Sequence, residues 1–407
     1  MVRIFICFIF FCSSLSLSAQ GLFSISGQVK DKKGETLPGA GIYLSGYTTA
    51  TVTNNDGKFT LPALKPGSYE VVIQMMGFLP YSKSILITDQ SASFTAILSE
   101  NTIQLQEVTI KADPNRAKNL KLFLEFFIGR TPNSAQCKLL NPQILFIEDD
   151  RKEGILRVST NDFLIVENKA LGYRLKYMLN LFEYDFNTRI IYFSGLPVFE
   201  DLKGSGSKRK KWLQAREIAY AGSPQHFFQS LYKNQIQQEG FILYKRVKTK
   251  NPDRPADSVI QAAKERLVKR IHGPLKAGSA LADSLSYWQQ VQQMPAENVT
   301  LDMRGVQTDT LVKTAGPDLK FINYTDELYV LFTPEQESNA YSSSGHYILR
   351  PLTIPNYQIS VIRMLKGPVG FYANGGMRDS RALLYEGFWA YEKIGDMVPM
   401  DYVPLAK

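Results

Sequence analysis

Apolar and polar residues alternate along several short stretches in the first quarter of the chain. Residues 23–30 and 69–76 follow this period of two most clearly. Such a period is typical of a β-strand with one buried face. Shorter runs, rich in β-branched and apolar residues, are 49–53, 58–61, 84–88, 93–98 and 105–110. The pattern therefore predicts about seven short strands.

Turn-forming residues separate these predicted strands. The Asp-Gly pair at 56–57 tolerates the positive φ angles of a tight hairpin, so residues 58–61 are expected to return beside 49–53. The Pro-Gly pair at 66–67 marks another reversal of the chain. Short strands at this spacing predict a seven-stranded antiparallel β-sandwich over residues 21–112.

The pattern changes after the predicted sandwich. A helix is predicted from the Asp-Pro pair at 113–114 to Gly129, because the apolar residues between them follow helical spacing. Residues 143–199 contain alternating and aromatic runs, which predict a second antiparallel β-unit. The clearest helix begins at 223–224, with serine as its N-cap and proline at its first position, and ends at Gly240.

The rest of the C-terminal region mixes helices with short strands. Residues 258–271, which are densely charged, and residues 280–293 predict two helices. The strands predicted after them are 321–324, 327–332, 348–352, 358–364 and 369–372. The predicted fold class is thus mainly β with α. The N-terminal sandwich is followed by a mixed α+β region over 113–407, in which the helices near 258–293 would separate two units.

The first twenty residues follow the pattern of a secretion signal. Arg3 supplies a positive start, residues 4–12 form an unbroken apolar run, and the Ser-Ala-Gln stretch at 18–20 suits peptidase cleavage. The apolar run is shorter than the about 20 residues that span a bilayer. A retained N-terminal anchor is the alternative. We expect a signal peptide over 1–20, cleaved near residue 20, and a location in the periplasm or at the outer membrane.

Composition supports a globular exported protein. Of 407 residues, 44% are hydrophobic and 12% aromatic, which favours folded domains over disorder. Nucleic acid is a poor partner for an exported protein, despite the formal net charge of +9. Two of the three cysteines lie in the predicted signal, so Cys137 can form no internal disulfide. Because no histidine lies near it in sequence, Cys137 is expected to be an incidental thiol.

The turn and strand residues of the predicted sandwich match a known pattern. The matching positions are Gly27, Gln28, Val29, Asp31, Gly34, Leu37, Pro38, Gly39, Ala40, Asp56, Gly57, Lys58, Phe59, Pro66, Gly67, Tyr69, Gly77 and Phe78. They resemble the carboxypeptidase-like regulatory domain, which implies a transthyretin-like sandwich of seven strands. In that family the domain is an accessory module and not the peptidase. It is common in exported proteins of the Bacteroidota, and it precedes the plug of starch-utilisation-type TonB-dependent transporters. The region after it is similar to uncharacterised C-terminal regions of such proteins.

No sequence motif for catalysis or metal binding is present. His226, His272 and His346 lie far apart, and none has the spacing of an HExxH or HxH site. Neither a G-x-S-x-G nucleophile elbow nor a G-x-x-x-x-G-K-[ST] phosphate loop occurs. His226, in the first turn of its predicted helix, is expected to be a packing or surface residue. The sequence therefore predicts no catalytic, cofactor-binding or metal-binding residue.

Two groups of carboxylates allow both a functional and a structural interpretation. The Glu-Asp-Asp stretch at 148–150 could supply paired carboxylates for glycoside chemistry, but the charged residues after it favour a hairpin turn. Asp31, Asn55 and Asp56 could gather a calcium ion at one end of the sandwich, and turn formation explains the same residues. We expect turns at both places and no bound cofactor.

Two further segments could contact ligands. Residues 204–212 read GSGSKRKKW, a flexible start followed by four cations. They could hold anionic lipid headgroups or polysaccharide phosphate, and a solvated hairpin tip is the simpler expectation. Residues 385–391 are densely aromatic and would stack on sugar rings if they were exposed. Burial in the core is the simpler expectation for them.

The leading hypothesis is a non-enzymatic protein of the cell envelope. Its sandwich would be a binding or docking module, and its C-terminal region would contact an outer-membrane transporter or an envelope glycan. The alternative is a polysaccharide or peptide hydrolase with a carboxylate-based site in the C-terminal region. A deep cleft with two carboxyl groups about 5–10 Å apart would favour the hydrolase. A flat or aromatic-lined surface would favour binding.

Overall fold

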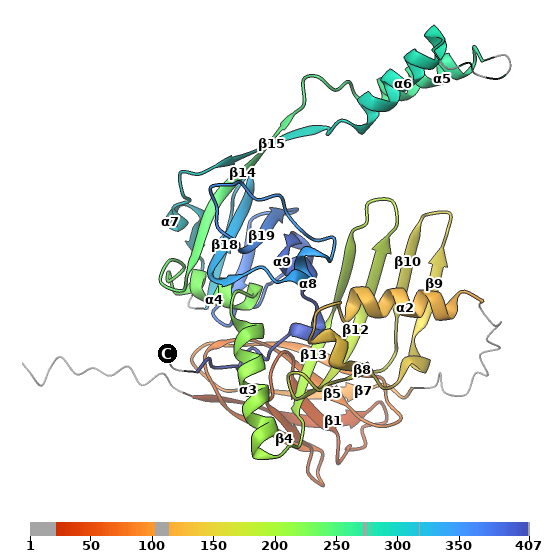
Figure 1. Ribbon diagram of the computed structural model, residues 1–407. Coiled ribbons are helices and arrows are strands. Elements are labelled where there is room, and N and C mark those ends of the chain that lie inside the picture. Colours follow the sequence, from red (N-terminus) through yellow and green to blue (C-terminus); the bar gives the residue numbers. More distant parts are fainter. Residues whose placement is uncertain are drawn as a thin grey trace, which may run out of the picture.

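The computed structural model describes residues 22–101, 114–271, 274, 276, 278–316 and 318–405. The predicted signal over 1–20, the predicted strand over 105–110 and His272 lie outside the described residues. Three bodies of β-structure follow one another along the chain, and a helical pair extends from the last of them (Figure 1). No helix of the described part is long and apolar enough to cross a membrane.

The N-terminal body is a sandwich of two sheets, as predicted. One sheet has the order β4-β1-β7, formed by β1 (Phe23–Asp31), β4 (Lys58–Leu64) and β7 (Ala92–Leu98). The other has the order β3-β2-β5-β6, formed by β2 (Gly41–Leu44), β3 (Ala50–Val52), β5 (Gly67–Gln74) and β6 (Tyr81–Ile87). Neighbouring strands are antiparallel except β1 and β7, which are parallel. Ile25, Ile42 and Val71 are fully buried between the sheets, and β2 is a strand that the sequence pattern did not predict.

The Asp-Gly turn at 56–57 joins the two sheets, which corrects the expected hairpin. β3 pairs with β2, whereas β4 pairs with β1. The turn itself forms as predicted. The Asn54 side-chain oxygen accepts the N–H groups of Asp56 and Lys58 at 3.1 and 2.8 Å, and Gly57 has a φ of +71°. A local turn signal locates the reversal, but strand pairing depends on the sheet in which the apolar residues are buried.

The second body is a six-stranded antiparallel sheet. Its strands are β8 (Cys137–Leu139), β9 (Phe146–Asp150), β10 (Ile155–Ser159), β11 (Leu164–Asn168), β12 (Tyr173–Asp185) and β13 (Ile191–Asp201). The order is β8-β11-β12-β10-β9, and β13 pairs with β12 along its other edge. The antiparallel unit predicted over 143–199 is therefore confirmed, although it begins earlier, at β8.

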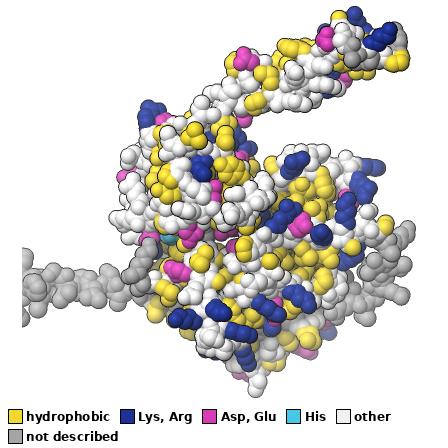
Figure 2. Space-filling view, viewed as in Figure 1, with side chains coloured by type: hydrophobic (Ala, Val, Ile, Leu, Met, Phe, Trp, Pro, Cys, Tyr) yellow, Lys and Arg dark blue, Asp and Glu magenta, His cyan; other side chains and the backbone are white. Residues whose placement is uncertain are grey.

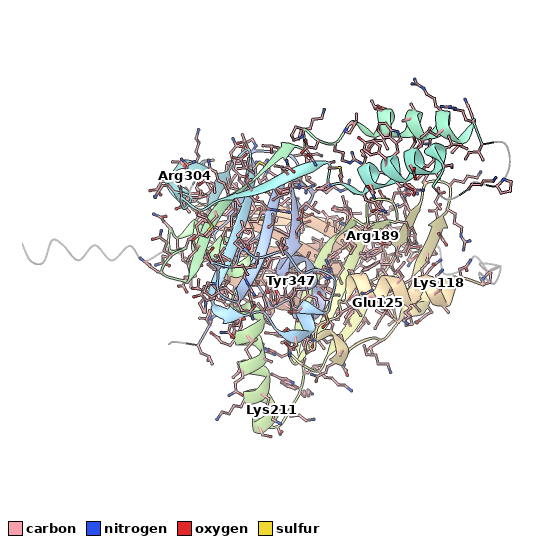
Figure 3. All side chains as sticks on the ribbon, turned by 45° about the horizontal axis from the view of Figure 1, so that its top comes forward. Lys118, Glu125, Arg189, Lys211, Arg304 and Tyr347 are labelled. Atoms are coloured by element: carbon pink, nitrogen blue, oxygen red, sulfur yellow. The ribbon has the colours of Figure 1, made fainter. Side chains whose placement is uncertain are left out.

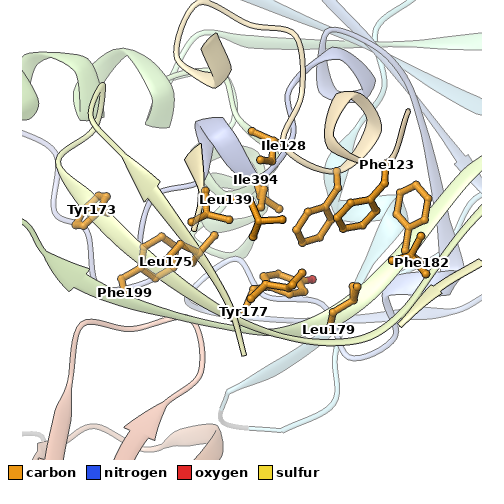
Figure 4. Close-up of a cluster of buried hydrophobic side chains, with 14 of the residues drawn as sticks. Phe123, Ile128, Leu139, Tyr173, Leu175, Tyr177, Leu179, Phe182, Phe199 and Ile394 are labelled. Atoms are coloured by element: carbon orange, nitrogen blue, oxygen red, sulfur yellow. The ribbon is translucent and has the colours of Figure 1, made fainter. Parts of the chain in front are cut away.

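The helix α2 (Arg116–Phe127) covers this second sheet. Phe123 and Phe127 stack with ring centres 4.9 Å apart and contact Phe182 and Tyr177 of β12 (Figure 4). The helix ends before Gly129, whose φ of +110° favours glycine. Two short 3₁₀ turns, η2 (Ser134–Gln136) and η3 (Pro142–Ile144), follow it. The predicted apolar stripe thus forms the core of the second body.

The third body contains two sheets, ordered β15-β14-β18-β19-β21 and β16-β17-β20. Its strands are β14 (Phe241–Lys250), β15 (Glu297–Asp302), β16 (Val312–Thr314), β17 (Leu319–Ile322), β18 (Glu327–Gln336), β19 (Tyr357–Met364), β20 (Val369–Tyr372) and β21 (Leu383–Gly387). Its short helices are α7 (Thr308–Leu311), α8 (Asn339–Ser342), α9 (Phe388–Tyr391) and η4 (Ser380–Ala382). The last one, η5 (Ile394–Asp396), packs instead in the core of the second body. The strand predicted over 348–352 is wrong, because Leu349 and Leu352 are exposed and join no sheet.

Two helices, α3 (Gly206–Tyr220) and α4 (Pro224–Tyr232), connect the second body to the third. Ser223 caps α4 as predicted, because its hydroxyl accepts the N–H of His226 at 3.2 Å. Phe227 of α4 is fully buried in the core of the third body. The helix ends earlier than predicted, and Asn234 continues the chain with a φ of +56°.

The helices α5 (Asp257–Val268) and α6 (Ala280–Gln293) form the connection between β14 and β15. Because β14 and β15 are paired in one sheet, these helices interrupt that sheet and do not separate two units. The paired strand ends carry the helices away from all the sheets (Figure 1). We call residues 245–302 the arm.

The sandwich is joined to the rest of the chain through its β2–β3 loop, residues 45–48. The N–H of Gly46 donates to the Pro197 carbonyl at 2.6 Å, and the Gly46 carbonyl accepts the N–H of Met400 at 2.7 Å. The Tyr47 carbonyl accepts a further N–H from β13 at 3.2 Å. The loop therefore bonds to both the second body and the C-terminal segment.

An apolar contact closes the same junction. Val72, on the outer side of β5, is fully buried against Phe163 and Val198 of the second body. Nearby, the Lys176 ammonium lies 4.9 Å from the ring centre of Tyr43 and donates to its hydroxyl at 3.1 Å. Buried apolar contact combined with backbone hydrogen bonds fixes the sandwich on the second sheet.

Candidate functional site

The described histidines lie in separate places. His226 is buried, with its Nδ1 accepting the N–H of Gly222 at 3.1 Å and its Nε2 lying 3.4 Å from the Glu239 carboxylate. His346 contacts Ser344, and burial lowers the pKa of His346. Within the described residues, no group of three or more His, Cys, Asp or Glu side chains could hold a metal ion. His226 therefore serves in packing and hydrogen bonding.

Cys137 lies half-buried at the start of β8. Its thiol donates to the Asn133 carbonyl at 3.5 Å. Burial raises the pKa of Cys137 to about 12, and the Asp396 carboxylate acts in the same direction. Because the thiolate is the nucleophilic form of cysteine, burial disfavours the reactive form of this side chain.

Both groups of carboxylates considered as sites border turns, because residues 148–150 end strand β9 and Asp31 ends strand β1. At the end of β9, Asp150 Oδ1 accepts two backbone N–H groups of the following turn at 3.0 and 3.1 Å. At the end of β1, Asp31 Oδ1 accepts two backbone N–H groups at 2.9 and 2.8 Å. Asn55 and Asp56 are exposed in the next turn. These oxygens serve the backbone, as the turn interpretation expects.

The aromatic segment 385–391 belongs to the core of the third body. Trp389 and Tyr391 are only 5% and 4% exposed. The indole N–H of Trp389 donates to the Gly222 carbonyl at 2.7 Å, and burial raises the pKa of Tyr385. The segment is therefore not an exposed surface for stacking sugars.

A buried polar cluster joins the end of α2 to the C-terminal segment. The Asp396 carboxylate accepts the Thr131 hydroxyl at 2.9 Å and the Asn133 side-chain amide at 3.0 Å. The Ser134 hydroxyl lies 2.9 Å from that of Thr131 and donates to the Ile128 carbonyl. Burial raises the pKa of Asp396 to about 6. Because Thr131, Ser134 and Asp396 are all buried, the cluster fastens two chain segments and is closed to substrate.

The shifted pKa of Asp396 predicts a specific pH dependence of stability. Its folded-state pKa of about 6 lies above the usual 3.8. The stability that its protonation provides is therefore complete below about pH 4 and is lost as the pH rises through 6. Asp396→Asn stays neutral at every pH. As the pH is raised from 4 to 7, we expect its free energy of unfolding to rise by about 3 kcal/mol relative to that of wild type.

Urea unfolding across this pH range measures the Asp396 effect. Asp253→Asn, at an exposed carboxyl group on the arm, is the matched control and should follow wild type throughout. A constant stability difference between Asp396→Asn and wild type from pH 4 to pH 7 would contradict the proposed titration.

A cavity of about 660 Å³ lies beside α7 at one edge of the third body. Residues within 234–243 and 305–309, together with Thr333, line it. Most of its polar side chains are amides, and Asp309 is the one carboxylate among the lining residues. The volume suits a small molecule, whereas glycoside hydrolysis requires two carboxyl groups. The cavity therefore does not match the hydrolase alternative.

The arm exposes apolar side chains from both of its helices. Ile260 and Val291 are buried between α5 and α6, at 1% and 5% exposure. Val259, Val268 and Tyr287 are instead more than half exposed, at 52%, 55% and 57%. The arm thus presents apolar surface on an element that stands away from the three β-bodies (Figure 1).

The basic run at 208–211 forms part of α3, which corrects the expected hairpin tip. The Lys, Arg, Leu, Gln and Ala residues that follow the Gly-Ser start are good helix formers. The second half of the helix is fixed to the second body. Trp212 donates its indole N–H to the Lys169 carbonyl at 3.0 Å, and the Arg216 guanidinium lies 3.7 Å from the ring centre of Tyr173.

The cations at 208–211 differ from the paired cations nearby, one of which, Arg216, belongs to the same helix. Lys176 and Arg216 form ion pairs with Glu200 and Asp201 at 2.6 and 2.7 Å. Residues 208–211 are all exposed, no acidic residue lies in the first turn, and no described carboxylate pairs with them. A cation near a helix N-terminus opposes the helix dipole at a cost of about 0.3–1 kcal/mol. Lys208 and Arg209, which lie in the first turn of α3, therefore carry this cost.

Each comparison with known proteins matches about a fifth of the chain. Residues 25–110 match the model of the CarboxypepD_reg-like domain. The TonB-dependent receptor SusC of Bacteroides thetaiotaomicron is 34% identical over 87 residues, which cover 21% of this chain. The matched segment is 8% of SusC, so this chain spans a small part of that relative's length.

Similar solved structures also match about a fifth of the chain. In the Coh3ScaB–XDoc complex of Acetivibrio cellulolyticus, a chain is 21% identical, with 19% of this chain and 58% of that chain covered at a TM-score of 0.18. Catechol 1,2-dioxygenase from Pseudomonas arvilla C-1 is 12% identical, and the match covers 21% of this chain and 54% of the dioxygenase chain at a TM-score of 0.18. These scores carry no argument about function. Residues 25–110 are a CarboxypepD_reg-like domain, as their turn motifs predicted.

Proposed function

We propose that the protein is a non-enzymatic docking protein of the cell envelope and that the arm is its docking element. The observation that carries this proposal is the exposed apolar surface of α5 and α6 on a projecting element. The partner we propose is an outer-membrane receptor of the TonB-dependent class. The CarboxypepD_reg-like domain at residues 25–110, and the similarity of 87 residues of this chain to part of a TonB-dependent receptor, support this envelope context.

The exposed side chains of the arm suit a protein partner. A helical pair that buries few residues gains little stability from its own core. Exposed apolar side chains on a projecting element are available for a protein–protein contact, in which aromatic residues such as Tyr287 are enriched. The strand pair at the base holds the helices out, so a partner can reach both of them. The arm therefore has the construction of an interaction element.

The sandwich has a different role in this proposal. Its β2–β3 loop and the outer side of β5 are occupied by the second body. We therefore assign docking to the arm, and we assign the sandwich to the rigid support of the C-terminal region.

Removal of the arm tests this proposal. Lys250 and Glu297 are opposite each other in the β14–β15 ladder, so an Asn-Gly turn can replace residues 251–296 and close a short hairpin. We expect the shortened protein to keep its fold, because the arm contributes little to the three cores. Its recovery of a TonB-dependent receptor from detergent-solubilised envelopes should fall more than tenfold below that of the full chain.

A triple variant provides the matched control for the deletion. Val259→Ala, Val268→Ala and Tyr287→Ala together remove the exposed apolar side chains and keep both helices, and they should reduce recovery by a similar factor. Mass spectrometry of the recovered proteins gives the measurement. Equal recovery by the folded deletion variant, or recovery of no envelope receptor by the full chain, would overturn the proposal.

A further inference from the structure

The basic turn of α3, defined as Lys208, Arg209, Lys210 and Lys211, is the charged surface that the proposed docking role leaves unexplained. All four side chains are exposed. Lys211 lies on the part of α3 that projects from the body (Figure 3), and dark-blue side chains gather over this part of the molecule (Figure 2). Their positive charge has no described partner within the chain.

The fold holds the basic turn in place although the basic turn does not stabilise the fold. Trp212 and Arg216 anchor the helix directly after it, through the Lys169 carbonyl and the Tyr173 ring. Lys208 and Arg209, in the first turn of the helix, also oppose the helix dipole. A fixed and locally unfavourable group of like charges is expected to have its partner outside the molecule.

An exposed apolar residue on the same helix indicates the kind of partner. Leu213 is 41% exposed, and it lies three and four positions after Lys210 and Arg209, on the same face of the helix. Cations beside an exposed leucine match the interface of a phospholipid bilayer, where phosphates accept hydrogen bonds and acyl chains receive apolar groups. A dissolved acidic glycan would use the cations and leave Leu213 in water.

We propose that the basic turn of α3 is a peripheral membrane-docking site for anionic phospholipids. Lys and Arg donate to headgroup phosphates, and Leu213 enters the boundary between headgroups and acyl chains. This contact is independent of the arm and requires no protein partner. Each cation near an anionic surface strengthens binding by roughly fivefold, and added salt weakens it.

Vesicle cosedimentation of the purified chain without its predicted signal tests this inference. The vesicles contain phosphatidylglycerol with phosphatidylcholine, or phosphatidylcholine alone. We expect binding to the anionic vesicles only, and a loss of more than tenfold in Lys208→Gln/Arg209→Gln/Lys210→Gln/Lys211→Gln. The thermal midpoint of this variant should stay the same or rise, because the charges it removes oppose the helix dipole.

Two further variants distinguish the effect of the basic turn on vesicle binding from the effect of the net charge of the protein. Lys250→Gln/Arg266→Gln/Lys269→Gln/Arg270→Gln removes the same number of charges from the arm and should stay within threefold of wild type. Leu213→Ser should weaken vesicle binding several-fold without changing retention on an immobilised sulfated dextran. Equal losses in both quadruple variants, or binding to the dextran without binding to anionic vesicles, would overturn the assignment to lipid.

Discussion

Trp389→Ala is expected to lower the free energy of unfolding by about 3–5 kcal/mol. The indole is 5% exposed, and its ring centre lies 5.1 Å from that of Phe227 and 5.5 Å from that of Tyr385. Its N–H also holds the Gly222 carbonyl between α3 and α4. The substitution therefore opens a cavity and leaves a buried carbonyl without its donor.

Two controls separate these contributions of Trp389. Trp389→Phe keeps an aromatic ring but removes the N–H donor, and should cost about 1–3 kcal/mol. Tyr287→Ala removes an exposed aromatic ring on α6 and should change stability by less than about 0.5 kcal/mol. Urea unfolding followed by tryptophan-independent circular dichroism measures all three. A Trp389→Ala variant as stable as Tyr287→Ala would contradict the buried position of the indole.

Gly46→Val is expected to detach the sandwich from its support. Gly46 has a φ of +84°, and a Cβ there would lie 2.9 Å from the Met400 sulfur. The left-handed conformation alone costs a residue with a side chain about 1–2 kcal/mol. The end of the Met400 side chain would also have to move aside, and the branched valine would strain the adjacent backbone hydrogen bonds, each worth about 0.5–1.5 kcal/mol. We expect a total loss of about 1–4 kcal/mol in the free energy of unfolding.

Gly77→Val supplies the matched control for this junction. Gly77 has a φ of +85°, but no atom lies within 4 Å of the position of its Cβ. Both variants incur the same backbone cost, so the difference between their urea midpoints isolates the contact with Met400. Equal midpoints would show that the β2–β3 loop does not fix the C-terminal segment.

The sequence predicted those elements whose signals are local. Alternation and runs of β-branched and apolar residues located six of the seven strands of the sandwich, and the Ser-Pro pair at 223–224 located the start of α4. The turn motifs also predicted the domain type of residues 25–110. These features depend on neighbouring residues, so short stretches of sequence contain the information for them.

The features that the sequence did not reveal depend on distant partners. The short strand β2 has only four residues, and the pairing of β3 and β4 with different sheets is decided by burial. Thr131 and Asp396 are 265 positions apart, and no pattern in the sequence connects them. The basic run at 208–211 was expected in a turn because Gly and Ser precede it, but the helix formers and the anchoring Trp212 determine α3.

The placement of the candidate surfaces follows from the same long-range contacts. The sequence predicted the helices α5 and α6. It did not predict that β14 and β15 pair, and it is this pairing that places both helices at the end of one β-hairpin and forms the projecting arm. The sandwich, the second body and the C-terminal segment meet at residues 45–48. We therefore expect these parts to form a single rigid body from which the arm and α3 project.

A distance measurement between the sandwich and the second body tests this claim most directly. Spin labels at Thr60→Cys and Lys152→Cys, both exposed positions, would be introduced on a Cys137→Ser background of the chain without its predicted signal. Pulsed dipolar spectroscopy should give a single narrow distance distribution, which Gly46→Val broadens. Two domains joined by a flexible linker would instead give a broad distribution of distances. Such a distribution in the labelled protein that keeps Gly46 would contradict a single rigid body.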